Sequence, residues 1–129
     1  QFEKQPNVSE CNYKNATTKN LPCIVVGDLH GSFKDLYYII DKYGIPGKNC
    51  RFVFNGDFVD RGPKQIEVLL TLLYCSLMYP SRVYLNRGNH EDLSINLSRH
   101  FDPNFKKDID SKYGKYSTTI FNESQRLFR

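Results

Sequence analysis

Short apolar segments and helical periodicity alternate through the middle of the chain. β-Branched and aromatic residues are concentrated at 22–27, 51–55 and 82–86, and the first of these runs is closed by Gly27, which is the profile of a buried strand. Apolar residues recur at i, i+3, i+4 and i+7 over 33–43 and 65–78, which predicts two amphipathic helices. This order predicts two consecutive βαβ units, and hence a parallel sheet with helices packed on it.

The segments outside this pattern are less regular. Residues 1–20 are polar and are expected to form an extended N-terminal arm. Beyond the third strand, Asp102 is an expected N-cap, with Pro103 in the first turn of a further helix. We expect Gly114 to separate that helix from another one over 117–128.

Length and composition exclude several classes of protein. The 129 residues suffice for one domain, and a hydrophobic content of 40% with 14% aromatic residues is typical of a globular protein. The net charge of +4 is scattered along the chain, so no nucleic-acid partner is indicated. No uncharged apolar run reaches the roughly 18 residues of a membrane span. No signal peptide is visible, so we expect reduced cysteines and a cytoplasmic or nuclear location.

Polar residues that can bind metals follow each of the three predicted strands. The segments are GDLHG at 27–31, GDFVDRG at 56–62 and RGNHED at 87–92. Because parallel strands end at the same edge of a sheet, these segments are expected to lie side by side. Carboxylate, imidazole and amide donors suit Mn, Fe or Zn better than they suit a thiolate site. Asp28 and His30 lie two residues apart and are expected to face one metal.

The three segments, in this order, resemble the successive motifs of the phosphoprotein phosphatase family of metal-dependent serine/threonine phosphatases. The forms FNGDFVDRG and LNRGNHED are especially similar to the branch called protein phosphatases with EF-hands, or retinal-degeneration C. The resemblance implies an α/β, calcineurin-like metallophosphoesterase fold, which is a central β-sandwich flanked by helices. This chain would supply its N-terminal βαβαβ portion, with residues 21–129 forming a partial catalytic domain whose C-terminal part is absent.

The resemblance also implies a set of metal ligands. Asp28 and His30 would bind one of two divalent metals (Mn, Fe or Zn), Asp57 would bridge both, and Asn89 would bind the second. Two adjacent cations can activate a water molecule and clamp the phosphoryl oxygens for in-line attack. The implied reaction is the hydrolysis of phosphoserine or phosphothreonine in phosphoprotein substrates.

Three further residues are implied to act on the substrate. His90 would be the general acid that protonates the leaving serine or threonine oxygen, and Asp60 would hold its ring by a hydrogen bond. A leaving alkoxide is strongly basic, so a positioned acid typically accelerates such a step roughly 10²–10⁴-fold. Arg61 would bind the substrate phosphate, because its planar fork matches two phosphate oxygens.

The chain departs from the family pattern in places. Ser32 stands where the family often has Gln, which we expect to be a local change. The family takes two further histidine ligands and another phosphate-binding arginine from beyond residue 129, and His100 is expected to be a surface or packing residue instead. With only Asp57 and Asn89 at the second metal, we expect the isolated chain to have little phosphatase activity.

The sequence leaves other functions open. No EF-hand loop pattern is present, so calcium or calmodulin would act through regions outside this chain. One alternative is another metallophosphoesterase, such as a dinucleotide polyphosphatase or a phosphodiesterase. Another is a truncated, catalytically weak binding module. A dinucleotide-binding protein is disfavoured because no G-x-G-x-x-G motif follows the first strand.

Overall fold

The computed structural model describes residues 8–10, 21–48 and 50–129, and its centre is a four-stranded sheet. The strands lie in the order β1 (Val8–Glu10), β2 (Cys23–Val26), β3 (Arg51–Phe54) and β4 (Val83–Leu85). β2, β3 and β4 are parallel, which confirms the predicted sheet. β1 pairs antiparallel with β2 and was not predicted; the remainder of the expected N-terminal arm lies outside the described residues.

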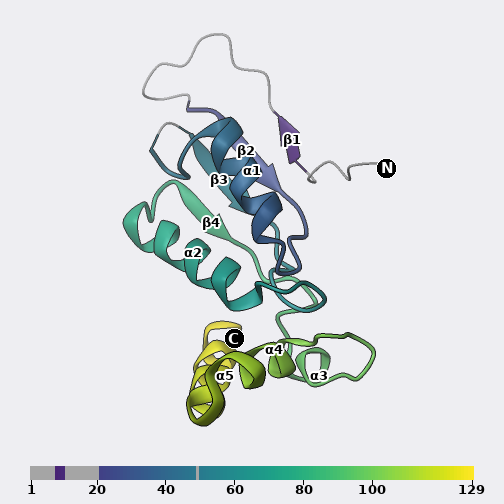
Figure 1. The fold of residues 1–129 in the computed structure, drawn as a ribbon. Coiled ribbons are helices and arrows are strands. Elements are labelled where there is room, and N and C mark those ends of the chain that lie inside the picture. The colour runs from purple at the N-terminus through teal and green to yellow at the C-terminus, as the bar shows by residue number, and fades with distance from the viewer. Residues whose placement is uncertain (1–7, 11–20, 49) are drawn as a thin grey trace, which may run out of the picture.

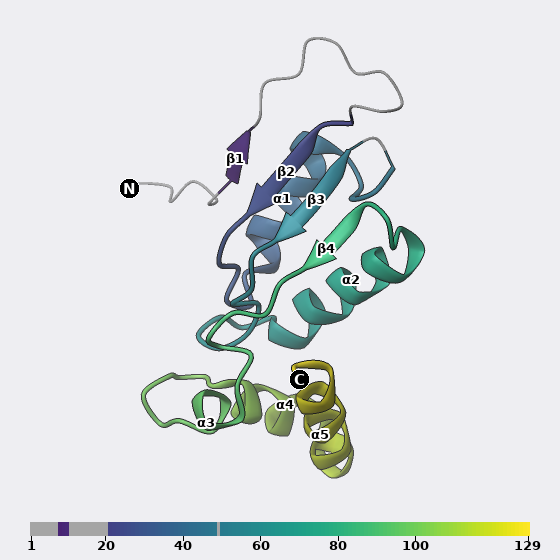
Figure 2. The same cartoon turned by 180° about the vertical axis from the view of Figure 1, so that it is seen from behind.

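Helices α1 (Phe33–Tyr43) and α2 (Gln65–Met78) cover one face of this sheet, as Figures 1 and 2 show from opposite sides. Both helices occupy the predicted ranges. The strand residues that face them are buried, because side chains alternate between the two faces of a strand; they are Ile24, Val26, Phe52, Phe54 and Val83. Ser32 caps α1, since its hydroxyl oxygen accepts a hydrogen bond from the Asp35 backbone N–H at 3.3 Å.

The opposite face of the sheet is more open. Val25 and Tyr84 point to it and keep 38% and 45% of their surface exposed. Within the described ranges no helix or second sheet covers this face, which Figure 2 shows towards the viewer. None of the described helices is both long enough and apolar enough to cross a membrane.

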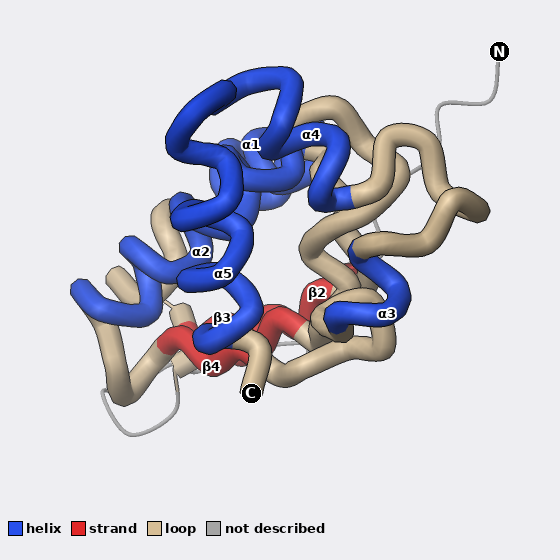
Figure 3. Tube along the Cα trace, turned by 90° about the horizontal axis from the view of Figure 1, so that it is seen from below, coloured by secondary structure: helices blue, strands red, loops and turns tan. Residues whose placement is uncertain are grey.

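The C-terminal helices form a separate layer beyond the carboxyl ends of the parallel strands (Figures 1 and 3). They are α3 (Leu93–Asn96), α4 (Phe105–Tyr113), a 3₁₀ turn η1 (Gly114–Tyr116) and α5 (Ser117–Leu127). The rings of Phe105, Phe121 and Phe128 pack together and join α4 to α5, with centroids 5.9–6.1 Å from that of Phe105. This layer therefore has its own apolar contacts.

The start of α4 differs from the prediction, which placed the N-cap at Asp102. The N-cap is Asn104, whose side-chain oxygen accepts a hydrogen bond from the Lys107 backbone N–H at 2.8 Å. Asp102 instead contacts the Lys107 ammonium at 3.1 Å. An amide caps a helix as well as a carboxylate does, so two neighbouring candidates could not be separated by residue type alone. The predicted break at Gly114 is confirmed.

Candidate active site

The three polar loops meet at one place, as the parallel sheet predicts. The loop after β2 is tied to the loop after β3 by backbone hydrogen bonds, in which His30 N–H donates to the Asp57 carbonyl at 2.9 Å and Gly31 N–H donates to the Phe58 carbonyl at 2.8 Å. The loop after β4 joins them where the His90 backbone N–H donates to Asp57 Oδ1 at 2.8 Å. Asp57 thus contacts both neighbouring loops.

The loops approach closely because glycine stands at the contact points. A Cβ atom at Gly88 would overlap the Asp57 carboxylate, and one at Gly62 would overlap the His30 carbonyl oxygen. Left-handed backbone is uncommon outside glycine and often marks functional sites. The described non-glycine residues that adopt it all belong to the predicted site, namely His30 (φ 44°), Asp57 (φ 54°), Asp60 (φ 63°) and Arg61 (φ 74°).

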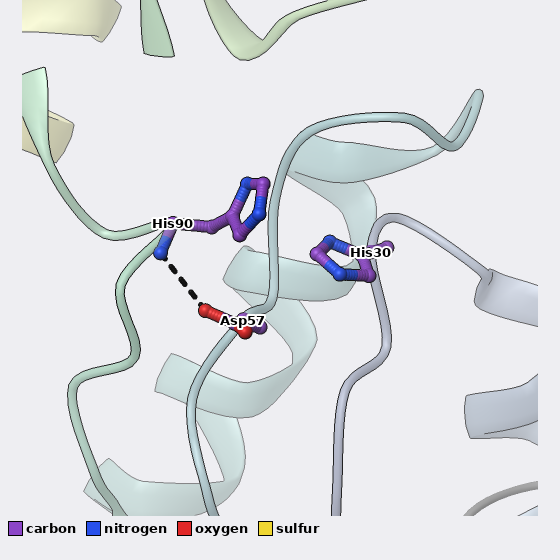
Figure 4. Close-up of side chains that lie close together, drawn as sticks. All are labelled: His30, Asp57 and His90. Carbon is purple, nitrogen blue, oxygen red and sulfur yellow. Dashed lines mark hydrogen bonds between the residues drawn. The ribbon is translucent and has the colours of Figure 1, made fainter. Parts of the chain in front are cut away.

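One group of potential metal ligands lies at the centre of these loops. Ligand atoms of His30, Asp57 and His90 lie within 4.8 Å of one another (Figure 4). His30 Nδ1 lies 2.8 Å from the Val59 carbonyl oxygen, which can only accept a hydrogen bond, so Nδ1 carries a proton and Nε2 is the nitrogen left to bind a metal. Nε2 in turn lies 3.7 Å from Asp28 Oδ2, so Asp28 and His30 face one point. This nitrogen and oxygen donor set fits a divalent transition metal.

The other predicted ligands lie at the rim. The Asp28 side chain is 57% exposed. Asn89 is also exposed and immediately precedes His90 in the loop after β4. Both residues therefore lie beside the central group, and their ligand roles remain predictions.

His90 and Asp60 form a buried pair. His90 Nδ1 lies 2.9 Å from Asp60 Oδ2, and the two side chains are 4% and 0% exposed. Asp60 Oδ1 accepts a second hydrogen bond from the Phe105 backbone N–H at 2.7 Å. The His90 ring packs edge-on against His30, with centroids 4.6 Å apart, and against Phe101 at 4.8 Å. The imidazole is therefore fixed from several sides.

Arg61 extends from the same loop as Asp60. Its backbone N–H donates to the Pro103 carbonyl at 2.9 Å, and its guanidinium lies 5.3 Å from the centre of the Phe101 ring. The side chain is exposed, so its donors are available to an anion. His100 is also exposed, as expected for a residue outside the site.

Glu91 connects two of the loops and has no predicted role. Its Oε2 accepts hydrogen bonds from the backbone N–H groups of Asp57 (2.7 Å) and Gly88 (2.9 Å), and Oε1 accepts one from Phe58 (2.8 Å). Only 1% of the residue is exposed. Burial raises the pKa of Glu91, although the three backbone hydrogen bonds act to lower it. Its place in the sequence could have indicated a role in the site, because Glu91 directly follows the predicted site residue His90.

Gln65 and Asn96 are two further buried polar residues whose contacts with the site the sequence did not predict. Gln65 Oε1 accepts a hydrogen bond from the Asp60 backbone N–H at 2.7 Å, and its Nε2 donates to the Gly62 and Pro103 carbonyls. Asn96 Nδ2 donates to Asp60 Oδ2 at 3.0 Å. Both residues hold the Asp60 segment in place from neighbouring helices.

Comparisons with known proteins agree with this geometry. A family model described as calcineurin-like phosphoesterase matches residues 21–127. The chain is 45% identical over 104 residues to Serine/threonine-protein phosphatase with EF-hands 1 of Mus musculus, covering 81% of this chain and 15% of that protein. It is 40% identical over 128 residues to Serine/threonine-protein phosphatase rdgC of Drosophila melanogaster, covering 99% of this chain and 18% of that protein.

A solved structure is also similar. It is a protein serine/threonine phosphatase from Saccharomyces cerevisiae with similarity to human phosphatase PP5, with a TM-score of 0.69 and 34% identity. The match covers 81% of this chain and 32% of that one. The chain therefore spans less than a fifth of the two curated relatives and about a third of the solved structure.

Proposed function

Because the chain belongs to the calcineurin-like phosphoesterase family, we propose that the protein containing it is a metal-dependent protein serine/threonine phosphatase. One observation carries this proposal. The loops after three parallel strands bring His30 and Asp57 beside a histidine, His90, that is hydrogen-bonded to a buried carboxylate. Such a site combines metal ligands with a positioned proton donor, which is what the hydrolysis of a phosphate ester from an alcohol requires.

The metal ligands in this proposal are Asp28, His30, Asp57 and Asn89. Two divalent ions, of manganese, iron or zinc, would supply charge neutralisation of the phosphoryl group and activation of water. The His30–Val59 hydrogen bond orients the imidazole for this role. The close approach at Gly88 keeps the Asp57 carboxylate beside the third loop.

His90 is the proposed general acid. Its Nδ1–H donates to Asp60, so Nε2 is the nitrogen left to give a proton to the departing serine or threonine oxygen. Asp60 also accepts hydrogen bonds from Asn96 Nδ2 and from the Phe105 backbone N–H, and so holds the ring in one orientation. Arg61, exposed beside this pair, is the proposed ligand of the substrate phosphate.

The proposed substrates are phosphoproteins. The names of two relatives refer to serine/threonine phosphatase activity and one refers to EF-hands. Calcium or calmodulin control of the parent protein is proposed only through regions outside this chain, and its proposed location is the cytoplasm or nucleus. No feature of the site favours a dinucleotide polyphosphatase or a phosphodiesterase over this activity.

The proposal is tested by substitutions in the full protein that contains this chain. His90→Asn should lower kcat on a phosphoserine peptide by roughly 10²-fold or more. Asp57→Asn should lower this activity too and, in addition, abolish its stimulation by Mn²⁺. His100→Asn is the matched control and should retain wild-type rates, because His100 is exposed outside the site. Full activity in the His90→Asn variant would contradict the proposed role of this histidine.

A further inference from the structure

We propose that Gln125 on α5, acting through Asn96, is a positioning residue for the Asp60–His90 pair. The expected effect on catalysis rests on the proposed function, whereas the expected effect on the position of the His90 ring rests on geometry alone. A chain of hydrogen bonds leads from Gln125 to Asn96, from Asn96 to Asp60, and from Asp60 to His90. It links α5 to Asp60, which lies 65 residues before Gln125 in the sequence.

Asn96 is the centre of this chain of hydrogen bonds. It is completely buried, and its Nδ2 donates both to Asp60 Oδ2 at 3.0 Å and to the His90 backbone carbonyl at 2.7 Å. A carboxylate and a carbonyl can only accept hydrogen bonds, so the amino group of the amide must face them. The amide oxygen of Asn96 must then face the other way.

Gln125 satisfies that oxygen. Its Nε2 donates to Asn96 Oδ1 at 2.8 Å, and the contact joins residues 29 positions apart. If the Asn96 amide were rotated by half a turn, its oxygen would face two acceptors and its amino group would face the Gln125 donor. Gln125 therefore stabilises the one orientation of Asn96 that holds the Asp60 carboxylate.

The position of Gln125 is set independently of the site. α5 is anchored by the buried rings of Phe121 and Phe128, which pack against Phe105 on α4. Gln125 itself is half-buried, so its polar group can be changed without removing part of the apolar core. Because a buried carboxylate responds strongly to each of its partners, a change at Gln125 should reach His90 through Asn96.

The test is Gln125→Glu in the full protein that contains this chain. A carboxylate at position 125 only accepts hydrogen bonds, so it attracts the Asn96 amino group and turns the amide away from Asp60. Asn122→Asp is the matched control, because it adds the same charge to an exposed position on the same helix. Thermal unfolding of both variants shows whether the fold is retained.

Two substrates separate positioning of the proton donor from general damage. A phosphoserine peptide needs a proton on its leaving oxygen, whereas p-nitrophenyl phosphate releases a weakly basic phenolate that does not. We expect Gln125→Glu to lower kcat on the peptide by about tenfold, a part of the typical contribution of a general acid. We expect less than about a twofold change on p-nitrophenyl phosphate, little change in KM, and wild-type behaviour for Asn122→Asp.

A second readout needs no activity. In the wild type, the His90 Nδ1–H proton should give an NMR signal protected by its hydrogen bond to Asp60, and Gln125→Glu should shift or remove that signal. Equal losses on both substrates with an unchanged His90 signal would overturn the inference. If the wild type hydrolyses neither substrate, the proposed function fails and the His90 NMR signal alone tests the inference. A shift or loss of that signal in Gln125→Glu then supports the inference, and an unchanged signal overturns it.

Discussion

Replacing Glu91 with glutamine tests how the loops of the site are held together. The carboxylate accepts three hydrogen bonds from backbone N–H groups, at 2.7–2.9 Å, while only 1% exposed. Glutamine has the same shape, but the amino group of its side chain cannot accept a hydrogen bond. Its oxygen can keep the bonds from Asp57 and Gly88, so the Phe58 N–H is left facing another donor. Losing one charge-assisted hydrogen bond and leaving one buried donor unpaired costs about 2–4 kcal/mol.

Equilibrium unfolding in urea measures this change in the free energy of unfolding. Asp92→Asn is the matched control, since it makes the same acid-to-amide change at the next position. Asp92 caps α3 through Ser94 N–H at 2.9 Å, and asparagine caps a helix about as well. The control should therefore change the free energy of unfolding much less than Glu91→Gln does. Equal stability of Glu91→Gln and the control would refute the idea that this carboxylate holds the loops.

Two other predictions concern pH dependence and metal binding. Burial raises the pKa of Glu67, but the hydrogen bond and charge of Lys112, a backbone hydrogen bond and the hydrogen bond from Lys64 together outweigh burial, so the pKa is lowered. Because the pKa of Glu67 is lower in the folded state than in the unfolded state, ionised Glu67 stabilises the fold at pH values above the unfolded pKa. Glu67→Gln should therefore lower the free energy of unfolding by up to about 1 kcal/mol at pH 7, and this difference from the wild type should vanish as the pH falls through the folded pKa. A difference in stability that persists at pH 2 would contradict this expectation. Gly88→Ala should displace Asp57 and weaken Mn²⁺ binding, measured by calorimetry, roughly 10–100-fold. Gly114→Ala is the control and should leave Mn²⁺ affinity unchanged, because a Cβ atom at Gly114 would meet open space. Equal Mn²⁺ affinities of the two variants would contradict the importance of the close approach at Gly88.

The βαβαβ portion of the fold could be predicted because each element has a strong local pattern. The strand runs are dense in β-branched and aromatic residues, and both helices keep an apolar stripe. α3 (Leu93–Asn96) has four residues, which is too short for any periodicity to show. β1 (Val8–Glu10) exists by pairing with β2, and a three-residue strand has no distinctive pattern of its own.

The site could be predicted only as far as it is local in sequence. The three motif loops follow predicted strands, so their convergence follows from the parallel sheet. Contacts made by Glu91, Gln65 and Asn96 depend on how side chains from separate elements meet. Asn96 reaches Asp60 across 36 residues, and Gln125 reaches Asn96 across 29. Nothing in the residue types alone indicates these pairings.

The proposed function is hydrolysis of phosphoserine or phosphothreonine, with the help of bound metal, by the protein that contains this chain. The most direct measurement is phosphate release from a phosphoserine peptide by the full protein, with added Mn²⁺ and after treatment with EDTA, beside a dinucleotide polyphosphate as competing substrate. We expect phosphate release from the peptide that EDTA abolishes and Mn²⁺ restores, and little cleavage of the dinucleotide. No release from the peptide in the presence of Mn²⁺, or release that persists after metal removal, would contradict it.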